Sequence, residues 1–235
     1  MSIIAGVDGC RAGWLGIWRD TDRGKIEHKV FRNAHDLIHQ KPRPLVIAID
    51  IPIGLTDAGK RDCDCMARKL LGQPRGTSVF PAPIRPALAA KSREEANRIT
   101  RAADGRGVGA QSWGIFPKVK EVDTELIEKP GLQSFVHEVH PELSFWAWNG
   151  RKPMSVAKKK PEGKAQRRRL VDTYFGNDAF QSIRSEHYKK EVADDDINDA
   201  LAALWTAERI LKGKAQLIPE MSQIDACGLI MEVWY

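Results

Sequence analysis

The chain has 235 residues, the length of one large domain, and its 42% hydrophobic and 29% charged residues are typical of a globular protein with a proper core. No stretch approaches the ~18 consecutive apolar residues that a membrane span requires, and no basic region precedes the first apolar run. We therefore expect a cytoplasmic protein without membrane association. Cys63 and Cys65 stand too close together for a zinc knuckle, so free thiols are expected.

The net charge of +6 is concentrated in one segment. Between Arg151 and Arg169 lie nine Lys or Arg residues and one acid, Glu162, a local charge of +8 that leaves −2 for the rest of the chain. Such a block favours either a site for polyanions such as nucleic acid or a solvated, mobile basic loop. The sequence leaves both interpretations open.

The N-terminal quarter predicts three strands, a helix and a fourth strand. The strands are expected at Ile3–Val7, Trp14–Trp18, Lys25–Phe31 and Leu45–Ile51. Asn33 is a suitable N-cap for the helix, which we expect to end near His39. Three successive strands followed by a helix and a buried strand indicate a mixed sheet with an antiparallel start and a parallel fourth strand.

The rest of the chain predicts a long helical insert and then further α/β elements. The insert spans about residues 56–132, with expected helices at 62–71, 92–103 and 118–128. After it we expect a strand at 134–140, helices at 164–174 and 197–211, and a strand at 229–234. No linker divides the sequence, so residues 1–235 are expected to form a single α/β domain in the order β-β-β-α-β-α-β-α.

Carboxylates follow several of these apolar elements. Asp8 follows the first strand, Asp50 ends the fourth, and Glu142 follows the strand at 134–140. An acid at the end of an apolar run costs burial energy unless it is paired, hydrogen-bonded or bound to metal. These acids are therefore candidates for a metal site.

Four further aspartates open the late helix. Asp196 and Asp199 are three residues apart and share a face with Ala200, which allows close approach to the sheet. The alternative is that these acids only favour the helix N-terminus, with Asp194 or Asp195 as N-cap. We assign that role to Asp194 and Asp195, and keep Asp196 and Asp199 as metal ligands.

The chemistry of this set favours Mg²⁺ or Mn²⁺, because the expected ligands are hard carboxylate oxygens without a histidine cluster. Two such ions ~3.5–4 Å apart can activate a water and stabilise the leaving oxygen of a phosphodiester.

Several motifs carry a resemblance to known families. The segments GVDGCRAGW (6–14), AIDIPIGL (48–55) and DINDALA (196–202) resemble the acidic motifs of bacterial Holliday-junction resolvases. Five longer segments recur in order in a bacterial family of predicted ribonuclease H-like nucleases, domain of unknown function 429: RDCDCMAR (61–68), SVFPAPIRPAL (78–88), SWGIFPKVKEVD (112–123), HEVHPELSFWAWNG (137–150) and DDDINDALAALWTA (194–207). The chain is identified as a member of this family over nearly its full length.

This resemblance implies a ribonuclease H-like fold and a metal site formed by Asp8, Asp50, Asp196 and Asp199. Glu142 is an added catalytic candidate without a clear counterpart in the resolvases. Kinship with the resolvases also suggests a homodimer.

Five residues outside the carboxylates are candidates for substrate contact. Four basic residues of the insert are candidates to contact phosphate, with solvated surface side chains as the alternative: Arg61, Arg68, Arg75 and Lys118. His140 is a candidate to orient Glu142 or transfer a proton, with a local hydrogen bond as the alternative.

Three functions from different classes remain. The leading prediction is a Mg²⁺- or Mn²⁺-dependent nuclease that hydrolyses phosphodiester bonds of DNA or RNA. The second is an ATPase or phosphotransferase of the actin-like fold, for which the sequence lacks a second phosphate loop and a Walker-type loop. The third is a non-catalytic nucleic-acid-binding protein that uses the basic block 151–169.

Overall fold

The computed structural model describes residues 2–235, which form a mixed α/β structure around a five-stranded sheet. The strand order is β3-β2-β1-β4-β5, with bounds β1 (Ile3–Cys10), β2 (Gly13–Asp20), β3 (Ile26–Phe31), β4 (Val46–Ile49) and β5 (Val136–Glu138). The first three strands are antiparallel, whereas β4 pairs parallel with β1 and β5 parallel with β4. The predicted mixed sheet with a parallel fourth strand is therefore confirmed.

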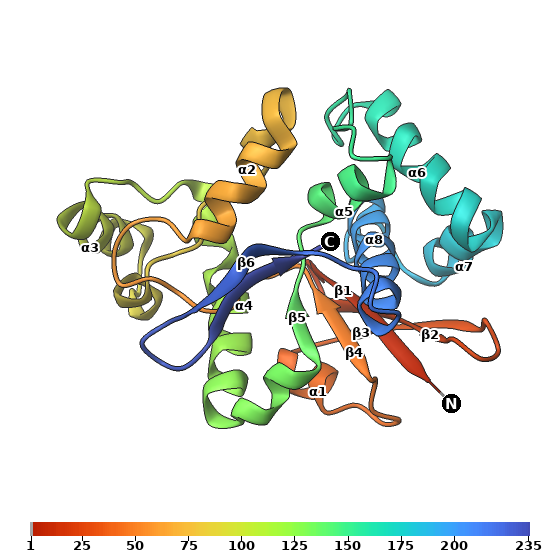
Figure 1. Cartoon of the computed structure of the whole chain (residues 1–235), viewed down its shortest axis with the longest axis horizontal. Coiled ribbons are helices and arrows are strands. Elements are labelled where there is room, and N and C mark those ends of the chain that lie inside the picture. Colours follow the sequence, from red (N-terminus) through yellow and green to blue (C-terminus); the bar gives the residue numbers. More distant parts are fainter. Residues whose placement is uncertain (1) are drawn as a thin grey trace.

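Helices cover both faces of this sheet (Figure 1). On one face lie α5 (Pro141–Trp148), α6 (Pro161–Phe175), α7 (Asn177–Glu186) and α8 (Asp194–Leu211). On the other lie α1 (Ala34–Ile38) and α4 (Ala110–Glu128). Side chains of β1 alternate between the two layers: Ile4 packs with the α8 side, and Ala5 and Val7 with the α1 and α4 side.

The central helix α8 lies unusually close to β1. A Cβ added at Gly6 would lie 2.1 Å from the Leu204 nitrogen and 2.3 Å from the Ala200 carbonyl oxygen, so no side chain fits there. The small alanines along α8 are fully buried in the same contact. The close approach expected from Ala200 and its neighbours is therefore present, and it brings the start of α8 near the end of β1.

The long insert and the C-terminal hairpin lie beside the sheet. The insert contains α2 (Asp62–Arg75), α3 (Arg93–Asp104), α4 and three short 3₁₀ turns, η1 (Gly76–Ser78), η2 (Arg85–Ala89) and η3 (Pro130–Ser134). The hairpin consists of β6 (Leu217–Ile224) and β7 (Ile230–Trp234), and a bridge from Val139 to Trp234 attaches it beyond β5. Asp225, in the turn of the hairpin, accepts from the Leu55 amide and from Arg85, which ties the hairpin to the insert.

Most predicted elements are present, with differences at their ends. Asn33 caps α1 by accepting from the Asp36 amide, as predicted. The helix expected at 118–128 begins earlier, at Ala110, and runs through Pro117. Asp8 lies inside β1 rather than after it. Among the longer elements, α5, α7 and β6 were not predicted.

The N-cap of α8 is a correction. The helix begins at Asp194 after Ala193, so neither Asp194 nor Asp195 is the N-cap. Asp196 instead accepts a hydrogen bond from the Ala193 amide at 2.8 Å, because a carboxylate at the third helical position reaches back to an amide that the helix leaves unpaired. One of its oxygens thus has the capping role that the sequence analysis assigned to its neighbours.

Two further expectations concern membranes and thiols. Nowhere in residues 2–235 is there a helix with both the length and the apolar character needed to span a bilayer. Cys63 is buried and Cys65 is exposed, and both are free thiols, as predicted.

Candidate carboxylate centre

The carboxyls of Asp8 and Asp50 meet at the junction of β1 and β4. In the parallel pairing of β1 with β4, Val7 lies opposite Ile49, and the Asp50 amide donates to the Val7 carbonyl at 2.9 Å. Asp8 follows Val7 and Asp50 follows Ile49, so the two aspartates lie side by side, Asp8 in β1 and Asp50 directly after β4. Because alternate residues of a strand share a face, Asp8 points to the same side as Gly6, toward α8. The two carboxyl groups share a hydrogen bond. Their juxtaposition follows directly from strand register.

The start of α8 adds Asp199 to this pair. Asp199 is 3% exposed and lies one residue before Ala200, whose carbonyl borders Gly6. Burial is the larger cause of the raised pKa values of Asp8 and Asp50, and the negative charge of Asp199 adds to it. Asp196, one turn earlier, is half-buried and contributes to the same electrostatic cluster. The structure therefore places all four predicted metal ligands in one electrostatic cluster, although no three of their ligand atoms lie within 4.8 Å of one another.

Burial and the charges of neighbouring acids raise the pKa values of Asp8, Asp50 and Asp196. Burial, followed by the charges of Asp50, Asp199 and Asp196, raises the pKa of Asp8 well above its ordinary value. Burial and the charge of Asp199 raise the pKa of Asp50 to about 7, and burial raises that of Asp196 to about 6. A cation added to this cluster would relieve the repulsion.

Lys158 supplies a cation to the cluster in this structure. Its ammonium donates to Asp199 Oδ2 at 2.5 Å, and its side chain is 40% exposed. Attraction to Asp199 first, and to Asp8 and Asp50 as well, raises the pKa of Lys158. Lys158 belongs to the basic block, and no pattern in the sequence indicates that this lysine, among nine basic residues, turns toward the acids.

A cavity of about 640 Å³ opens above the cluster. Asp8 and Asp50 lie in its wall together with Lys158. This volume is in the range of pockets that hold small ligands. The remaining residues of its wall come from the insert, the start of α5, the loop before α6 and the ends of β1 and β4: Gly9, Ile51, Pro52, Arg75, Thr77, Ser78, Phe80, Gln111, Gly114, Ile115, Lys118, His140, Pro141, Glu142, Ala157 and Lys159.

Glu142 lies at the cavity but is held by a buried arginine. Its Oε1 accepts from Arg167 Nε at 3.0 Å, and both side chains are almost fully buried. The second oxygen, Oε2, is buried and has no hydrogen-bond partner among residues 2–235. Glu142 therefore has one oxygen fixed by Arg167 and one buried oxygen without a partner among the described residues.

His140 also lines the cavity and has an unpartnered nitrogen. Its Nδ1 is buried without a hydrogen-bond partner in the described part of the chain. Burial lowers the pKa of the imidazole, which favours its neutral form. The local hydrogen bond that the sequence analysis considered as an alternative is therefore not found at this atom.

The prediction that Arg61 contacts substrate is wrong. Arg61 is 2% exposed, and it donates to Glu138 at 2.7 Å from both terminal nitrogens and to Asp64 at 2.5 Å. A guanidinium enclosed by two carboxylates cannot reach a ligand, so this residue is part of the core that joins α2 to β5. Arg68 donates to the Val79 carbonyl at 2.6 Å and is not among the residues that line the cavity.

Lys118 lies at the cavity and is fixed by local contacts. Its ammonium donates to the Gly13 carbonyl and lies 4.6 Å from the centre of the Trp14 ring. A Cβ at Gly9 would lie 2.8 Å from Lys118 Cδ, so the lysine stem passes directly over this glycine, next to Asp8. Lys118 therefore lines the cavity with its stem, while its ammonium is held at Gly13 and Trp14.

The basic block is folded rather than a free loop. Lys158 and Arg167 turn inward to Asp199 and Glu142, and Met154 is buried. Five of its cations are exposed: Arg151, Lys152, Lys159, Lys160 and Arg169. The block thus combines internal ion pairs with an outward positive surface next to the cavity.

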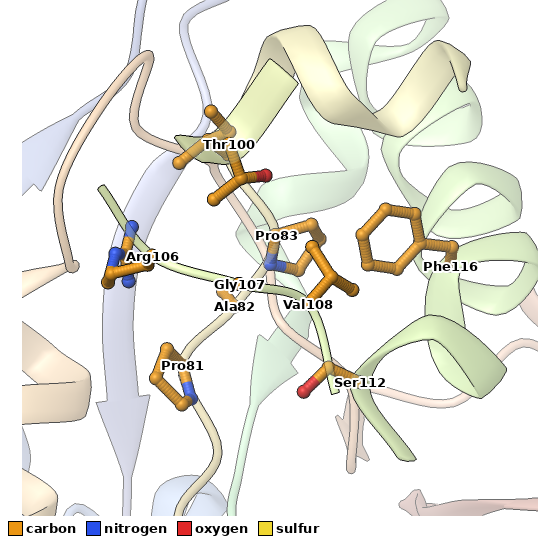
Figure 2. A pocket seen from close by; sticks show the side chains of 10 residues that line it. Pro81, Ala82, Pro83, Thr100, Arg106, Gly107, Val108, Ser112 and Phe116 are labelled. Atoms are coloured by element: carbon orange, nitrogen blue, oxygen red, sulfur yellow. The ribbon is translucent and has the colours of Figure 1, made fainter. Parts of the chain in front are cut away.

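A second cavity lies between α3 and α4, away from the carboxylates (Figure 2). It has a volume of about 50 Å³ and is lined mainly by apolar side chains such as Pro83 and Phe116. Thr100 Oγ1, at its edge, is buried without a partner among the described residues. This space has room for a water or two but not for a substrate.

A family model described as "Protein of unknown function (DUF429)" matches residues 6–224. The chain belongs to this family. The match covers the end of β1 with Asp8, the whole insert, the basic block and α8, so every residue of the carboxylate centre lies within the matched region. Neither the curated proteins nor the solved structures contain a match to this chain.

Proposed function

We propose that this protein has the ribonuclease H-like fold and is a Mg²⁺- or Mn²⁺-dependent nuclease that hydrolyses phosphodiester bonds of nucleic acid. The observation that carries the proposal is the electrostatic cluster of Asp8, Asp50, Asp196 and Asp199, from three separate elements, of which Asp8 and Asp50 line a cavity that also has lysines in its wall. The sheet order, with three antiparallel strands followed by two parallel ones, supports the fold assignment.

The residues fit a divalent cation by their chemistry. The candidate ligands are carboxylate oxygens, which Mg²⁺ and Mn²⁺ prefer. Burial, and after it the negative charge of neighbouring acids, raises the pKa values of Asp8 and Asp50, and the positive charge of Lys158 offsets this only in part. The four acids are spread too widely for three of their ligand atoms to lie within 4.8 Å of one another, so a bound ion would draw them together and displace Lys158 from Asp199.

Asp8, Asp50 and Asp199 would hold the metal, with the free oxygen of Asp196 completing the shell. A pair of such ions, when bound, supplies an activated water and neutralises charge on the leaving oxygen. His140, neutral and with Nδ1 unpartnered among residues 2–235, is placed to accept a proton at the cavity wall. Glu142 Oε2, close by in the chain, is an acceptor on the same wall.

The positive rim favours a polyanionic substrate. Lys118, Lys159 and Arg75 line the cavity and are placed to bind phosphate groups on either side of a scissile bond. The exposed cations of the basic block extend this positive surface beyond the cavity. A chain of phosphates matches that arrangement better than a single small anion does.

The proposal is tested by incubating the purified protein with Mn²⁺ and single-stranded, duplex and branched DNA, and with RNA. We expect cleavage of at least one of these substrates, and a fall of about 100-fold or more for Asp8→Asn and Asp199→Asn. Asp57→Asn, an exposed acid outside the cavity, is the matched control and should retain full activity.

Two results would overturn the proposal. One is the absence of Mn²⁺-dependent cleavage of every substrate. The other is cleavage that survives Asp8→Asn unchanged. Salt-dependent binding of nucleic acid that persists in Asp8→Asn, without cleavage by the wild type, would indicate the non-catalytic binding protein instead.

A further inference from the structure

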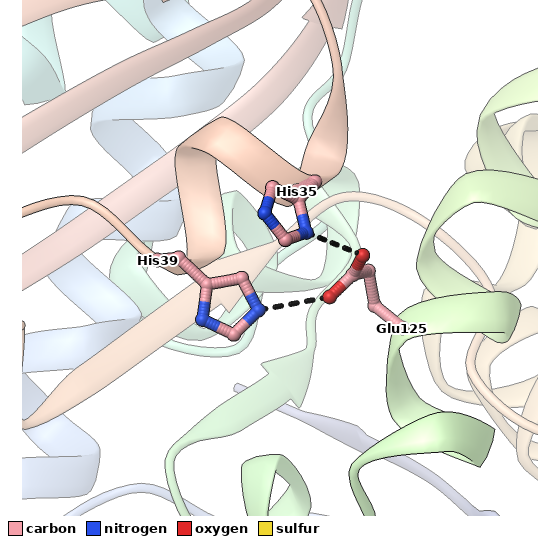
Figure 3. Close-up of side chains that lie close together, drawn as sticks. All are labelled: His35, His39 and Glu125. Carbon is pink, nitrogen blue, oxygen red and sulfur yellow. Dashed lines mark hydrogen bonds and ion pairs between the residues drawn. The ribbon is translucent and has the colours of Figure 1, made fainter.

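A cluster of two histidines and a glutamate lies on the side of the sheet opposite α8 (Figure 3). His35 Nδ1 lies 2.8 Å from Glu125 Oε1, and His39 Nε2 lies 2.9 Å from Glu125 Oε2. The three candidate ligand atoms all lie within 4.8 Å of one another. In the described part of the chain, no other three His, Cys, Asp or Glu side chains converge this closely.

The local structure holds these side chains in place. His35 lies in the short helix α1 and His39, four residues later, is its C-cap, so both imidazoles lie on the same side of this turn. Glu121, one turn before Glu125 on α4, accepts from the Ala34 amide at 2.8 Å and so fixes the start of α1 against α4. The spacing of the three ligands is therefore set by a helix contact that exists without any ion.

We propose that His35, His39 and Glu125 bind a first-row transition-metal dication, with Zn²⁺ as the expected occupant. Two imidazole nitrogens and one carboxylate oxygen are the ligand set of many zinc sites, whereas hard ions such as Mg²⁺ bind oxygen ligands in preference to imidazole. An imidazole binds a metal through the lone pair of an unprotonated nitrogen, so any proton on His35 Nδ1 or His39 Nε2 would move to the other ring nitrogen or to solvent when the ion binds.

The site is accessible and has room for a fourth ligand. The exposed fractions of the His35 and His39 side chains are 56% and 32%, so an ion can reach them without opening the fold. An adjoining groove of about 600 Å³ is lined by both histidines and by residues of β3 and the loop after α1. Three protein ligands with an open position leave space for water or a small anion.

Lys129 is the competitor for this site. Its ammonium lies 3.5 Å from Glu125 Oε2 and 3.1 Å from His39 Nε2, so its positive charge borders the position of the ion. With 46% of its side chain exposed, it can swing into solvent. Removing this charge should strengthen binding of a dication.

The test is titration of tag-free, chelator-treated protein with Zn²⁺ by calorimetry in excess Mg²⁺, which occupies sites made of oxygen ligands alone. Co²⁺ in place of Zn²⁺ gives a visible absorption band when imidazole binds. We expect the wild type to bind one Zn²⁺ per chain at this site. His35→Ala and Glu125→Gln should each lower the affinity for Zn²⁺ by about 100-fold or more. Lys129→Gln should bind Zn²⁺ about tenfold more tightly, because it removes a nearby positive charge.

Two variants serve as matched controls. His187 Nε2 lies 3.1 Å from His28 Nδ1, but the nearby carboxylate of Glu186 lies against the opposite nitrogen of His28, so among residues 2–235 this pair has no third ligand within reach of the same ion. His187→Ala should therefore bind Zn²⁺ as the wild type does, and so should Glu128→Gln, an exposed acid on the same helix as Glu125.

Zn²⁺ affinity that is unchanged by His35→Ala, or lowered equally by His187→Ala, would overturn the inference. So would weaker binding by Lys129→Gln. Because the site shares no residue with the carboxylate centre, Asp8→Asn should leave Zn²⁺ binding intact, and failure of the nuclease proposal would leave this one standing.

Discussion

The folded protein favours the protonated, neutral form of the Asp50 carboxyl. Its pKa is about 7 in the folded chain against an ordinary value of 3.8. Below pH 3.8 it is protonated in both states, whereas between about pH 4 and pH 7 the unfolded chain ionises and the folded chain does not. In the metal-free protein Asp50 therefore contributes a loss of stability as pH rises through this window.

Asp50→Asn should remove this loss. We expect the melting temperature of Asp50→Asn minus that of the wild type, both measured in chelator, to increase as pH rises from about 4 to about 7. Above about pH 7 this difference should stay constant. The melting temperature of Asp57→Asn should change with pH as that of the wild type does. Parallel curves for Asp50→Asn would show that Asp50 ionises freely in the folded protein.

Arg61 is a residue whose role differs between the prediction and the structure. The buried guanidinium neutralises Glu138 and Asp64, which are 6% and 4% exposed. Arg61→Ala leaves both charges buried without this partner, and we expect a loss of about 3–5 kcal/mol in the free energy of unfolding.

Urea denaturation measures this loss. Arg98→Ala, at an arginine side chain that is 78% exposed, should change stability by less than about 0.5 kcal/mol. If Arg61→Ala retained full stability but bound nucleic acid more weakly, the original prediction of substrate contact would be restored.

The contact between α8 and β1 is the packing on which the carboxylate centre depends. Because Gly6 leaves no space for a Cβ, Gly6→Ala must push α8 away from the sheet. We expect destabilisation of about 1–3 kcal/mol or more, with reduced Mn²⁺ binding because Asp199 moves from Asp8.

Gly114→Ala is the opposite control for chemical denaturation. Gly114 lies in helix α4 and an added Cβ there meets nothing within 4 Å, so alanine should be neutral or stabilise by up to about 1 kcal/mol. If Gly6→Ala were as stable as the wild type, α8 would be packed loosely enough against the sheet to accept the extra methyl group.

Elements with a strong local pattern could be predicted from the sequence, and those without one could not. The alternation and turn residues of β1 to β4, and the cap at Asn33, are local signals. In contrast, α5 is apolar on every side and has no helical periodicity, while β6 contains Pro219 and is largely exposed, so it lacks alternation. Both are defined by tertiary packing against α8 and β7.

The same division applies to the candidate site. Asp8 and Asp50 could be identified because each acid interrupts an apolar run, and strand register brings them together. Lys158 could not, because its ion pair with Asp199 joins two segments 41 positions apart. The burial of Arg61 could not be predicted either, since its partner Glu138 lies 77 positions away in the sequence.

Across the whole molecule, the cavity is assembled from segments that are distant in sequence. The ends of β1 and β4 supply its acids, the insert supplies Arg75 and Lys118, and the loop before α6 supplies Lys158 and Lys159. The metal-free cluster holds a lysine ammonium beside Asp199, where we propose that a divalent cation binds. Exchange of the ammonium for the cation is the central proposal.

A crystal grown without metal and then soaked in Mn²⁺ tests this exchange most directly. We expect anomalous density between Asp8, Asp50 and Asp199, with Lys158 displaced from Asp199. Absence of density there, with Lys158 still bound to Asp199 at saturating Mn²⁺, would contradict it.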